Sequence, residues 1–411
     1  MSVPAELRQV IRRIEERARA AATRPVRRGT LEDLVEGAAE ETERGAIFVT
    51  RRRYPLDGAH GVQPLAPIRA LDGECLAMLA RREPHPGGAP RLLYLDTETT
   101  GLAGGTGTYA FLVGVGFVDG DEFEVRQYFM RDLDEEPALL AALDGLVRGF
   151  EGLVTYNGTG FDLPLLETRF VLGRRRWPTD PFHLDLLPAA RRLWSARLPD
   201  CRLATVEQSV LRFHRRDDLP GALIPAVYFE YLRRKQPGEL PRIFEHNRHD
   251  ILSLAALTGW VAHAAARAPG ADVAPDELAG LGHLWERRDA DRGEACFREA
   301  LARGLAGAGR ARLLGRLAWG EKRRARWTEA RALWDEVARE QPCFDPRPWE
   351  EMAKIDEHRL RDWARARSVV QEALARAEAG RAALEARAAL GHRLERLERR
   401  LLRRVLPAPG A

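Results

Sequence analysis

The chain has 411 residues, of which 65 are basic and 61 acidic, and 45% of its positions are hydrophobic. This length predicts two or three domains, each able to bury a core, which excludes a disordered, collagen-like or fibrous protein. The formal net charge of +4 is small for the length, so any nucleic-acid binding must come from local patches.

Residues 1–90 are predicted to be an N-terminal extension and linker. Apolar residues recur at helical spacing from Leu7 to Ile14, which predicts an amphipathic helix over residues 4–22. The remainder is rich in proline and glycine, as in the run from His85 to Gly88, and favours turns.

Residues 91–266 are predicted to form an α/β domain with a mixed sheet and flanking helices. Short apolar or alternating runs indicate strands, and runs with leucine on one face indicate helices. Strands are expected at 92–95, 109–118, 122–130 and 153–156, with a strand or a helix start at 183–187. Helices are expected at 135–150, 163–172 and 242–266. Antiparallel strands followed by alternating helix and strand are typical of such a mixed sheet.

Residues 275–405 are predicted to be an all-helical repeat domain, because a small–large–small pattern recurs. Gly293, Phe297 and Ala300 are matched 37 residues later by Ala330, Trp334 and Val337, and 36 further on by Ala366, Val370 and Ala373. The pattern resembles the second helix of tetratricopeptide repeats and covers roughly three of them. It suggests a protein partner for this region. The tail over 392–404 is predicted to be a capping helix, with a nucleic-acid arm as the alternative.

The four cysteines lie far apart without a CxxC pair: Cys75, Cys201, Cys296 and Cys343. This spacing argues against disulfides or a structural zinc site. The N-terminus mixes arginine with glutamate, unlike a transit peptide, and the longest charge-poor stretch, 251–266, is too short and polar to cross a membrane. We therefore expect a cytoplasmic protein with no membrane association.

Carboxylates at the ends of predicted elements form the candidate site. Asp96 and Glu98 follow the apolar run at 92–95, and residues two apart on a strand share a face. Asp162 opens a predicted helix after the sequence Asn157-Gly158-Thr159-Gly160-Phe161. Asp250 lies on the last helix of the domain, one turn after His246.

These three segments, in this order, resemble the DEDD superfamily of metal-dependent 3′–5′ exonucleases on a ribonuclease H-like fold. The resemblance is closer to the YprB-type ribonuclease H-like family and covers most of the chain. It extends to an Arg-Tyr-Pro-Leu-Asp sequence at 53–57 and to the stretch 217–228 with its Pro-Gly pair.

The resemblance implies hydrolysis of phosphodiester bonds of DNA or RNA with two divalent ions, Mg²⁺ or Mn²⁺. It assigns the ions to four carboxylates, Asp96, Glu98, Asp162 and Asp250, whose oxygens suit these hard cations. It suggests that Thr97, Thr99, Asn157 and Phe161 bind a single-stranded nucleic-acid end. Without cations, carboxylates this close would repel one another.

The histidine expected to act on the attacking water departs from the family pattern. Related exonucleases have a tyrosine four residues, or a histidine five residues, before the last aspartate. Here His246 lies four before Asp250 and Glu245 five before. We take His246 as the candidate base, with His249 as the alternative.

Two other readings of the chain remain open. In one, a weak or inactive nuclease fold binds a nucleic-acid end while the helical repeats recruit a protein. In the other, the repeats form a scaffold without any nucleic-acid role. Three arginine-rich clusters, two of them with tryptophan at 174–177 and 191–197, suggest phosphate and base contacts or merely a solvated surface. Asp185 is expected to have a structural role, with a peripheral place at the metal site as the alternative.

Overall fold

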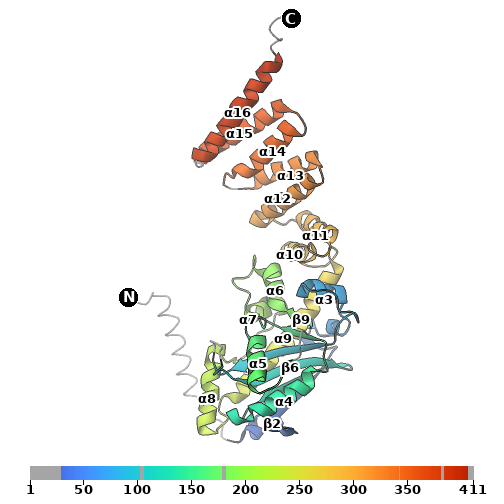
Figure 1. The fold of residues 1–411 in the computed structure, drawn as a ribbon, viewed down its shortest axis with the longest axis vertical. Helices are drawn as coiled ribbons and strands as arrows, with labels where there is room; N and C mark the ends of the chain where they lie inside the picture. The colour runs from blue at the N-terminus through green and yellow to red at the C-terminus, as the bar shows by residue number, and fades with distance from the viewer. Residues whose placement is uncertain (1–28, 102–105, 178–181, 342, 381–383, 406–411) are drawn as a thin grey trace, which may run out of the picture. The chain divides into compact units, whose positions relative to one another are not determined.

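The computed structural model describes residues 29–101, 106–177, 182–341, 343–380 and 384–405. It divides into two compact units, Met1–Arg267 and Ala268–Ala411 (Figure 1). The helix expected at 4–22 lies outside the described residues. Within the described part of the chain, no helix is both long and apolar enough to cross a membrane.

The first unit is built on a seven-stranded sheet with the order β1-β2-β7-β6-β5-β8-β9. The first five strands in this order run antiparallel to their neighbours, and β8 and β9 are parallel to β5. The strands are β1 (Ala38–Thr42), β2 (Gly45–Pro55), β5 (Leu92–Thr99), β6 (Ala110–Asp119), β7 (Glu122–Phe129), β8 (Gly152–Thr155) and β9 (Phe182–Asp185). A separate two-stranded sheet pairs β3 (Ala59–His60) with β4 (Gln63–Pro64). The predicted mixed sheet is therefore confirmed.

Helices cover both faces of the sheet. They are α2 (Leu31–Leu34), α3 (Gly73–Ala80), α4 (Glu136–Val147), α5 (Asp162–Leu172), α6 (Leu186–Trp194), α7 (Leu203–Val206), α8 (Ile224–Arg234) and α9 (Leu240–Arg267). In Figure 1, α4 and α5 lie in front of the strands and α9 passes behind them. Glycine allows the close approach of α9 to β6, because a Cβ at Gly114 would meet Asn247 at 2.1 Å and one at Gly116 would meet Ile251 at 2.5 Å.

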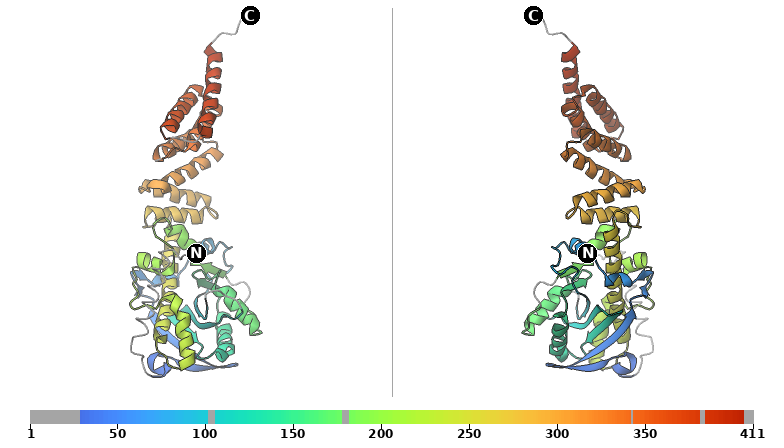
Figure 2. Two further views of the ribbon diagram at one scale, coloured as in Figure 1. Left: turned by 90° about the vertical axis from the view of Figure 1, so that its left-hand side faces the viewer. Right: turned by 90° about the vertical axis from the view of Figure 1, so that its right-hand side faces the viewer.

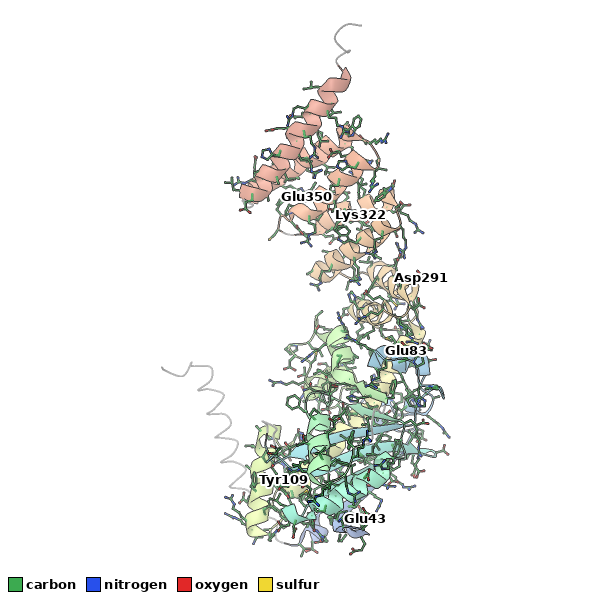
Figure 3. The ribbon with its side chains drawn as sticks, viewed as in Figure 1. Glu43, Glu83, Tyr109, Asp291, Lys322 and Glu350 are labelled. Atoms are coloured by element: carbon green, nitrogen blue, oxygen red, sulfur yellow. The ribbon has the colours of Figure 1, made fainter. Side chains whose placement is uncertain are left out.

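Aromatic side chains fill the core beside the sheet. Phe111 on β6 stacks on Tyr228 of α8 with ring centroids 3.9 Å apart, and both rings are fully buried. Tyr109, just before β6 and labelled in Figure 3, lies 4.0 Å beneath the guanidinium of Arg169 on α5. Such burial of aromatic surface fixes the helices against the sheet.

The prediction of a linker over residues 1–90 is wrong for its described part. β1 and β2 complete the sheet, with Phe48 paired to Phe129 and Thr50 to Gln127 on β7. The buried half of β2, residues 47–50, is apolar apart from Thr50, whereas Arg51, Arg52 and Arg53 lie on its exposed half. This charge run and the proline- and glycine-rich surroundings concealed a long strand.

The second unit consists of helices, as predicted. They are α10 (Pro275–Trp285), α11 (Ala290–Ala302), α12 (Gly307–Arg323), α13 (Trp327–Glu340), α14 (Pro346–His358), α15 (Trp363–Ala379) and α16 (Leu384–Val405). They stack one after another (Figures 1 and 2). The repeated large residues Phe297, Trp334 and Val370 are buried, and the tight contact of Gly293 with Glu286 explains a small residue at that position. The tetratricopeptide resemblance itself stays a prediction.

Candidate active site

Asp96 and Glu98 lie on β5, in the interior of the sheet. Leu93 and Leu95 are fully buried on one face of the strand, so the two carboxylates point to the opposite face, toward α9. β8 pairs with β5 only at residues 92–94. The carboxylates therefore follow the point where the two parallel strands separate, which is where α/β folds place their binding crevices.

Asp162 is held against β5 from the start of α5. Its Oδ1 accepts hydrogen bonds from the backbone nitrogen of Thr97 at 3.1 Å and from the Thr97 hydroxyl at 2.6 Å. Asp185 anchors the preceding loop, because its carboxylate accepts from the backbone nitrogens of Asn157 at 2.7 Å and Thr159 at 3.2 Å. Asn157 itself has a φ of 66°, which asparagine tolerates better than most residues.

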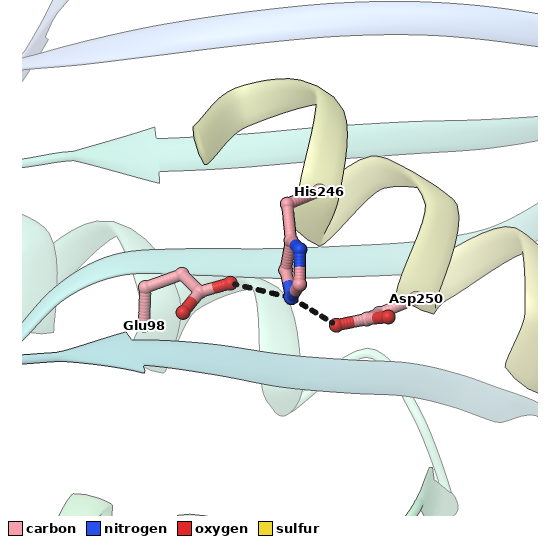
Figure 4. Close-up of side chains that lie close together, drawn as sticks. All are labelled: Glu98, His246 and Asp250. Atoms are coloured by element: carbon pink, nitrogen blue, oxygen red, sulfur yellow. Dashed lines mark ion pairs between the residues drawn. The ribbon is translucent and has the colours of Figure 1, made fainter. Parts of the chain in front are cut away.

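His246 and Asp250 lie one turn apart on α9 and face Glu98 (Figure 4). The Nε2 atom of His246 is 4.0 Å from Glu98 Oε1 and 3.5 Å from Asp250 Oδ2. One ligand atom from each of these three residues lies within 4.8 Å of the others. The Nδ1 atom of His246 lies 2.7 Å from Asp218 Oδ1, which fixes the ring with Nε2 toward the carboxylates.

Asp96 is tied to α9 by a buried chain of amide groups. Asn247 Nδ2 donates to Asp96 Oδ2 at 2.9 Å, and Asn247 Oδ1 accepts from Gln127 Nε2 at 2.9 Å. Thr50 of β2 donates in turn to Gln127 Oε1 at 3.0 Å. One hydrogen-bonded series thus joins β2, β7, α9 and β5, and it ends at the candidate metal ligand Asp96.

The protonation behaviour of these groups fits a cation-binding site. Burial, followed by the charges of Asp250, Asp162 and Glu98, raises the pKa of Asp96 well above its ordinary value. Burial also raises the pKa of Glu98 to about 8 and that of Asp162 to about 6, although the cationic His246 opposes the first shift and Thr97 the second. Carboxylates that resist ionisation together are stabilised in their charged form by a hard divalent cation.

Arg215, which the sequence did not single out, supplies positive charge at the edge of the cluster. Its guanidinium forms buried ion pairs with Asp250 and, at 2.5 Å, with Glu207, and it lies 3.6 Å from Asp218. Ser253 donates a further hydrogen bond to Glu207 at 2.6 Å. Although burial opposes it, the combined carboxylate charge raises the pKa of Arg215, so the side chain is a permanent cation.

A cleft of about 440 Å³ opens beside three of the four carboxylates, Asp96, Glu98 and Asp162. Three of the predicted substrate residues, Thr97, Thr99 and Phe161, also line it, and the ring of Phe161 is 60% exposed. The fourth predicted substrate residue, Asn157, is not among the lining residues. Its backbone shapes the turn before Asp162 instead.

His249 lies away from the carboxylate cluster. Its ring packs against Phe213, with centroids 4.9 Å apart, and faces His60 at 6.3 Å. Burial, with the charges of Arg215 and Arg248, lowers its pKa to about 4, so it is neutral. Of the two candidate histidines, the geometry brings only His246 beside Glu98 and Asp250.

The tryptophans of the arginine clusters are part of the core. Trp177 is 8% exposed and packs edge-on against Phe170, and Trp194 is 1% exposed beside Trp260. Neither ring is available to stack on a base, so of the two alternatives left open for 174–177 and 191–197, base contacts by these tryptophans are ruled out. In the second unit, arginines of α16 pair with the buried Glu357 while Leu397 is buried, as a capping helix requires.

Comparison with known proteins relates most of the chain to one family. A family model described as the RNase_H superfamily matches residues 93–262. The chain is 33% identical over 291 residues, 69% of its own length and 69% of the relative's, to the uncharacterized protein YprB of Bacillus subtilis (strain 168). The solved family B DNA polymerase from the hyperthermophilic archaeon Pyrobaculum calidifontis is 16% identical with a TM-score of 0.35, and the match covers 50% of this chain and 30% of that one. That last likeness is too slight to bear on function.

Proposed function

Because the chain belongs to the RNase H superfamily, in the family of YprB, we propose that it is a metal-dependent nuclease that removes nucleotides from 3′ ends of single-stranded DNA or RNA. The observation that carries the proposal is the convergence of Asp96, Glu98, Asp162 and Asp250 from β5, α5 and α9. Thr97 joins Asp162 to β5, Asn247 joins Asp96 to α9, and His246 lies between Glu98 and Asp250, so direct contacts hold the four carboxyl groups near one another.

The four carboxylates would hold two Mg²⁺ or Mn²⁺ ions. When bound, these ions supply a nucleophile from water at neutral pH and stabilise the leaving oxygen. The protein's own part is to fix the ligands before substrate arrives. Thr97 positions Asp162, and Asn247 positions Asp96, each through a hydrogen bond shorter than 3 Å.

His246 is proposed to move the proton of the attacking water. Its Nε2 faces the cluster while Asp218 holds Nδ1. Burial alone would lower the pKa of His246, but the hydrogen bond to Asp218 and the charges of Asp250 and Glu98 raise it to about 9. The ring can accept a proton at neutral pH only when the carboxylate charge is neutralised, so its action as a base would be coupled to a loaded site.

One observation favours the alternative of a nucleic-acid-binding module with weak or no activity. The guanidinium of Arg215 is paired with Oδ1 of Asp250, so this oxygen is already engaged. A ligand role for Asp250 must then use Oδ2, which faces His246. A slow enzyme, or one that binds an end without cleaving it, would follow if that oxygen were insufficient.

The test is a cleavage assay with single-stranded DNA and RNA labelled at the 5′ end, in Mg²⁺ or Mn²⁺. Asp96→Asn with Glu98→Gln is the control, because both changes keep shape and remove charge. A descending ladder with the intact protein alone supports 3′–5′ exonuclease action and identifies the sugar. Internal cuts that are absent with the control variant would support the same catalytic site but would mean that the protein is an endonuclease. Intact substrate under every condition would favour the binding module.

A further inference from the structure

The second unit contains a groove of about 930 Å³ that no step of the proposed reaction uses. It is formed by α12, the C-terminal half of α13 and the start of α14, all within residues 307–348. Its volume is in the range of ligand-binding clefts. In the region 275–405 the basic residues exceed the acidic ones by six, so the unit as a whole carries net positive charge.

One face of α12 presents arginine and tryptophan to the groove. Arg312, Arg316, Trp319 and Arg323 follow one another at intervals of four, three and four residues, which aligns them along the helix. Trp319 is 38% exposed and packs edge-on against Trp334 at 5.5 Å, while the ammonium of Lys322, labelled in Figure 3, lies 4.5 Å from its ring. The partly exposed indole of Trp319 thus lies among cationic side chains.

The arginines that line the groove make fewer contacts within the protein than its acidic side chains do. Arg312, Arg323 and Arg347 are exposed and make no ion pair with any residue that the structure describes, whereas Arg316 pairs with Glu286. The acidic side chains are engaged. Glu340 accepts from Arg310 at 2.9 Å, and Asp345 caps the start of α14 through the backbone nitrogen of Arg347. The groove therefore favours an anion.

A second observation also indicates an unfilled binding role. The indole Nε1 of Trp334 is buried and has no hydrogen-bond partner in the described part of the chain. Trp334 is one of the residues that line the groove, and a buried donor without an acceptor is costly.

We propose that this groove binds single-stranded nucleic acid, with guanidinium groups on phosphates and Trp319 stacked on a base. Arginine for the backbone and an exposed aromatic face for the bases is the usual chemistry of single-strand binding. An acidic peptide would match the charge but has no planar group for Trp319. The inference takes its ligand class from the proposed function, and the binding itself requires neither metal nor cleavage.

The test measures binding by the full-length protein in EDTA, so that the strand stays intact. The probes are fluorescein-labelled dT20 and U20, followed by fluorescence anisotropy. Arg312→Gln with Arg323→Gln is expected to weaken binding about tenfold and, because two phosphate contacts are lost, to make the salt dependence of log Kobs shallower by about 1.4. The matched control is Arg287→Gln with Arg367→Gln, two exposed arginines of the same unit that form no ion pair within the described residues and lie outside the groove.

The stacking contact has its own test. Trp319→Leu is expected to weaken binding at least fivefold, and Trp319→Phe, which keeps a ring, is expected to restore most of it. If Trp319→Leu and Trp319→Phe both bind weakly and both lose the same thermal stability, the weak binding reflects a folding defect. The inference is then tested by the Arg312→Gln with Arg323→Gln variant alone. Equal affinity of the groove variant and its control overturns the inference.

The remaining outcomes separate this inference from the proposed function. Binding that depends on the groove arginines in a protein without nuclease activity keeps the inference and rejects the nuclease. Cleavage that depends on Asp96, together with an oligonucleotide affinity that the groove substitutions do not change, keeps the nuclease and rejects the inference. A polyglutamate peptide that displaces dT20 at equal charge concentration would show a site for acidic peptides and would also overturn the inference.

Discussion

Asn247 lies between Asp96 and Gln127 and hydrogen-bonds both, donating to the first at 2.9 Å and accepting from the second at 2.9 Å. The amide is fully buried and has one side for each partner. It therefore sets the distance between α9 and β5, the two elements that carry Asp250 and Asp96. This side chain therefore helps to fix the position of one candidate ligand relative to another.

Replacement of Asn247 by leucine should lower stability. Asp96 loses its donor, while Gln127 keeps its second contact with the backbone oxygen of Phe244. We expect the free energy of unfolding to fall by about 1–3 kcal/mol, measured by urea denaturation. Glu245→Gln, on the exposed side of the same helix, is the control and should leave it nearly unchanged. A fully stable Asn247→Leu protein would mean that this hydrogen bond does not hold α9 in place.

Divalent metal should stabilise the folded protein through the carboxylate cluster. Mg²⁺ or Mn²⁺ at a hundred times its dissociation constant is expected to raise the free energy of unfolding by about 2.7 kcal/mol, seen as a higher Tm. Glu98→Gln removes one charged ligand and should abolish most of the shift. Glu36→Gln, an exposed carboxylate of the same unit, should keep it. Equal shifts in the two variants would place the metal elsewhere.

Loss of Arg215 should leave two buried carboxylates without their cation. Arg215→Met is expected to reduce the free energy of unfolding by about 3–5 kcal/mol in EDTA, because Glu207 and Asp250 stay buried after losing the guanidinium that they share. Added Mg²⁺ should recover part of this loss at Asp250. The comparison is Arg234→Met, which breaks an exposed ion pair with Glu230 and should have little effect. A mild effect of Arg215→Met that metal does not change would contradict the assigned role.

The two histidines of α9 should separate in kinetics. If His246 moves the proton, His246→Gln lowers the cleavage rate about 10²–10⁴-fold while the metal-induced rise in Tm persists. His249→Gln should cleave at close to the normal rate, since its ring packs on Phe213. Single-turnover rates with a labelled oligonucleotide provide the measurement. The reverse order of the two variants would move the proton transfer to His249.

Acid should destabilise the first unit through His60. This side chain is 5% exposed and its Nε2 lies 2.8 Å from Ser253 Oγ. Burial, followed by the charges of His249 and Arg215, lowers its pKa from 6.5 to about 3. The group is neutral in the fold, so its contribution is complete above pH 6.5 and is lost as the pH falls from 6.5 toward 3, at up to about 1.4 kcal/mol per pH unit.

The pH effect is measured as a difference between variants. Free energies of unfolding at several pH values between 6.5 and 4 should fall less steeply for His60→Asn than for the unchanged protein. His214→Asn, at an exposed position nearby in the chain, should retain the full slope. Parallel curves for His60→Asn and the unchanged protein would mean that His60 does not respond to acid in this range.

Local pattern in the sequence was enough to predict the centre of the sheet. The apolar run at 92–95 and the leucine face of the helix predicted at 135–150 each depend on neighbours within a few residues. The corresponding elements, β5 and α4, begin within one residue and end within four residues of their predicted bounds. The region 183–187, left open between strand and helix, contains both, because β9 ends at Asp185 and α6 begins at the next residue.

Long-range contacts explain what the sequence could not predict. Arg215 follows a segment with a π-helical turn and precedes Asp217 and Asp218, so it resembles a solvated charge until the fold buries it against Glu207. Asn247 is adjacent to His246, and only the approach of β5 makes it a partner of Asp96. A polar residue at a buried helix position was the available indication for Asn247, and the charged Arg215-to-Asp218 run was a weaker one for Arg215.

Strand β2, which lies between β1 and β7, also limits how far the chain can be shortened from its N-terminal side. Thr50 begins the hydrogen-bonded series that reaches Asp96 through Gln127 and Asn247. A truncated protein that starts at β5 would keep every candidate metal ligand, yet it would expose the open edge of β7 and leave Gln127 without its hydroxyl partner. Conserving the carboxylates is therefore not sufficient for a minimal active fragment, whose N-terminal limit must lie before residue 38.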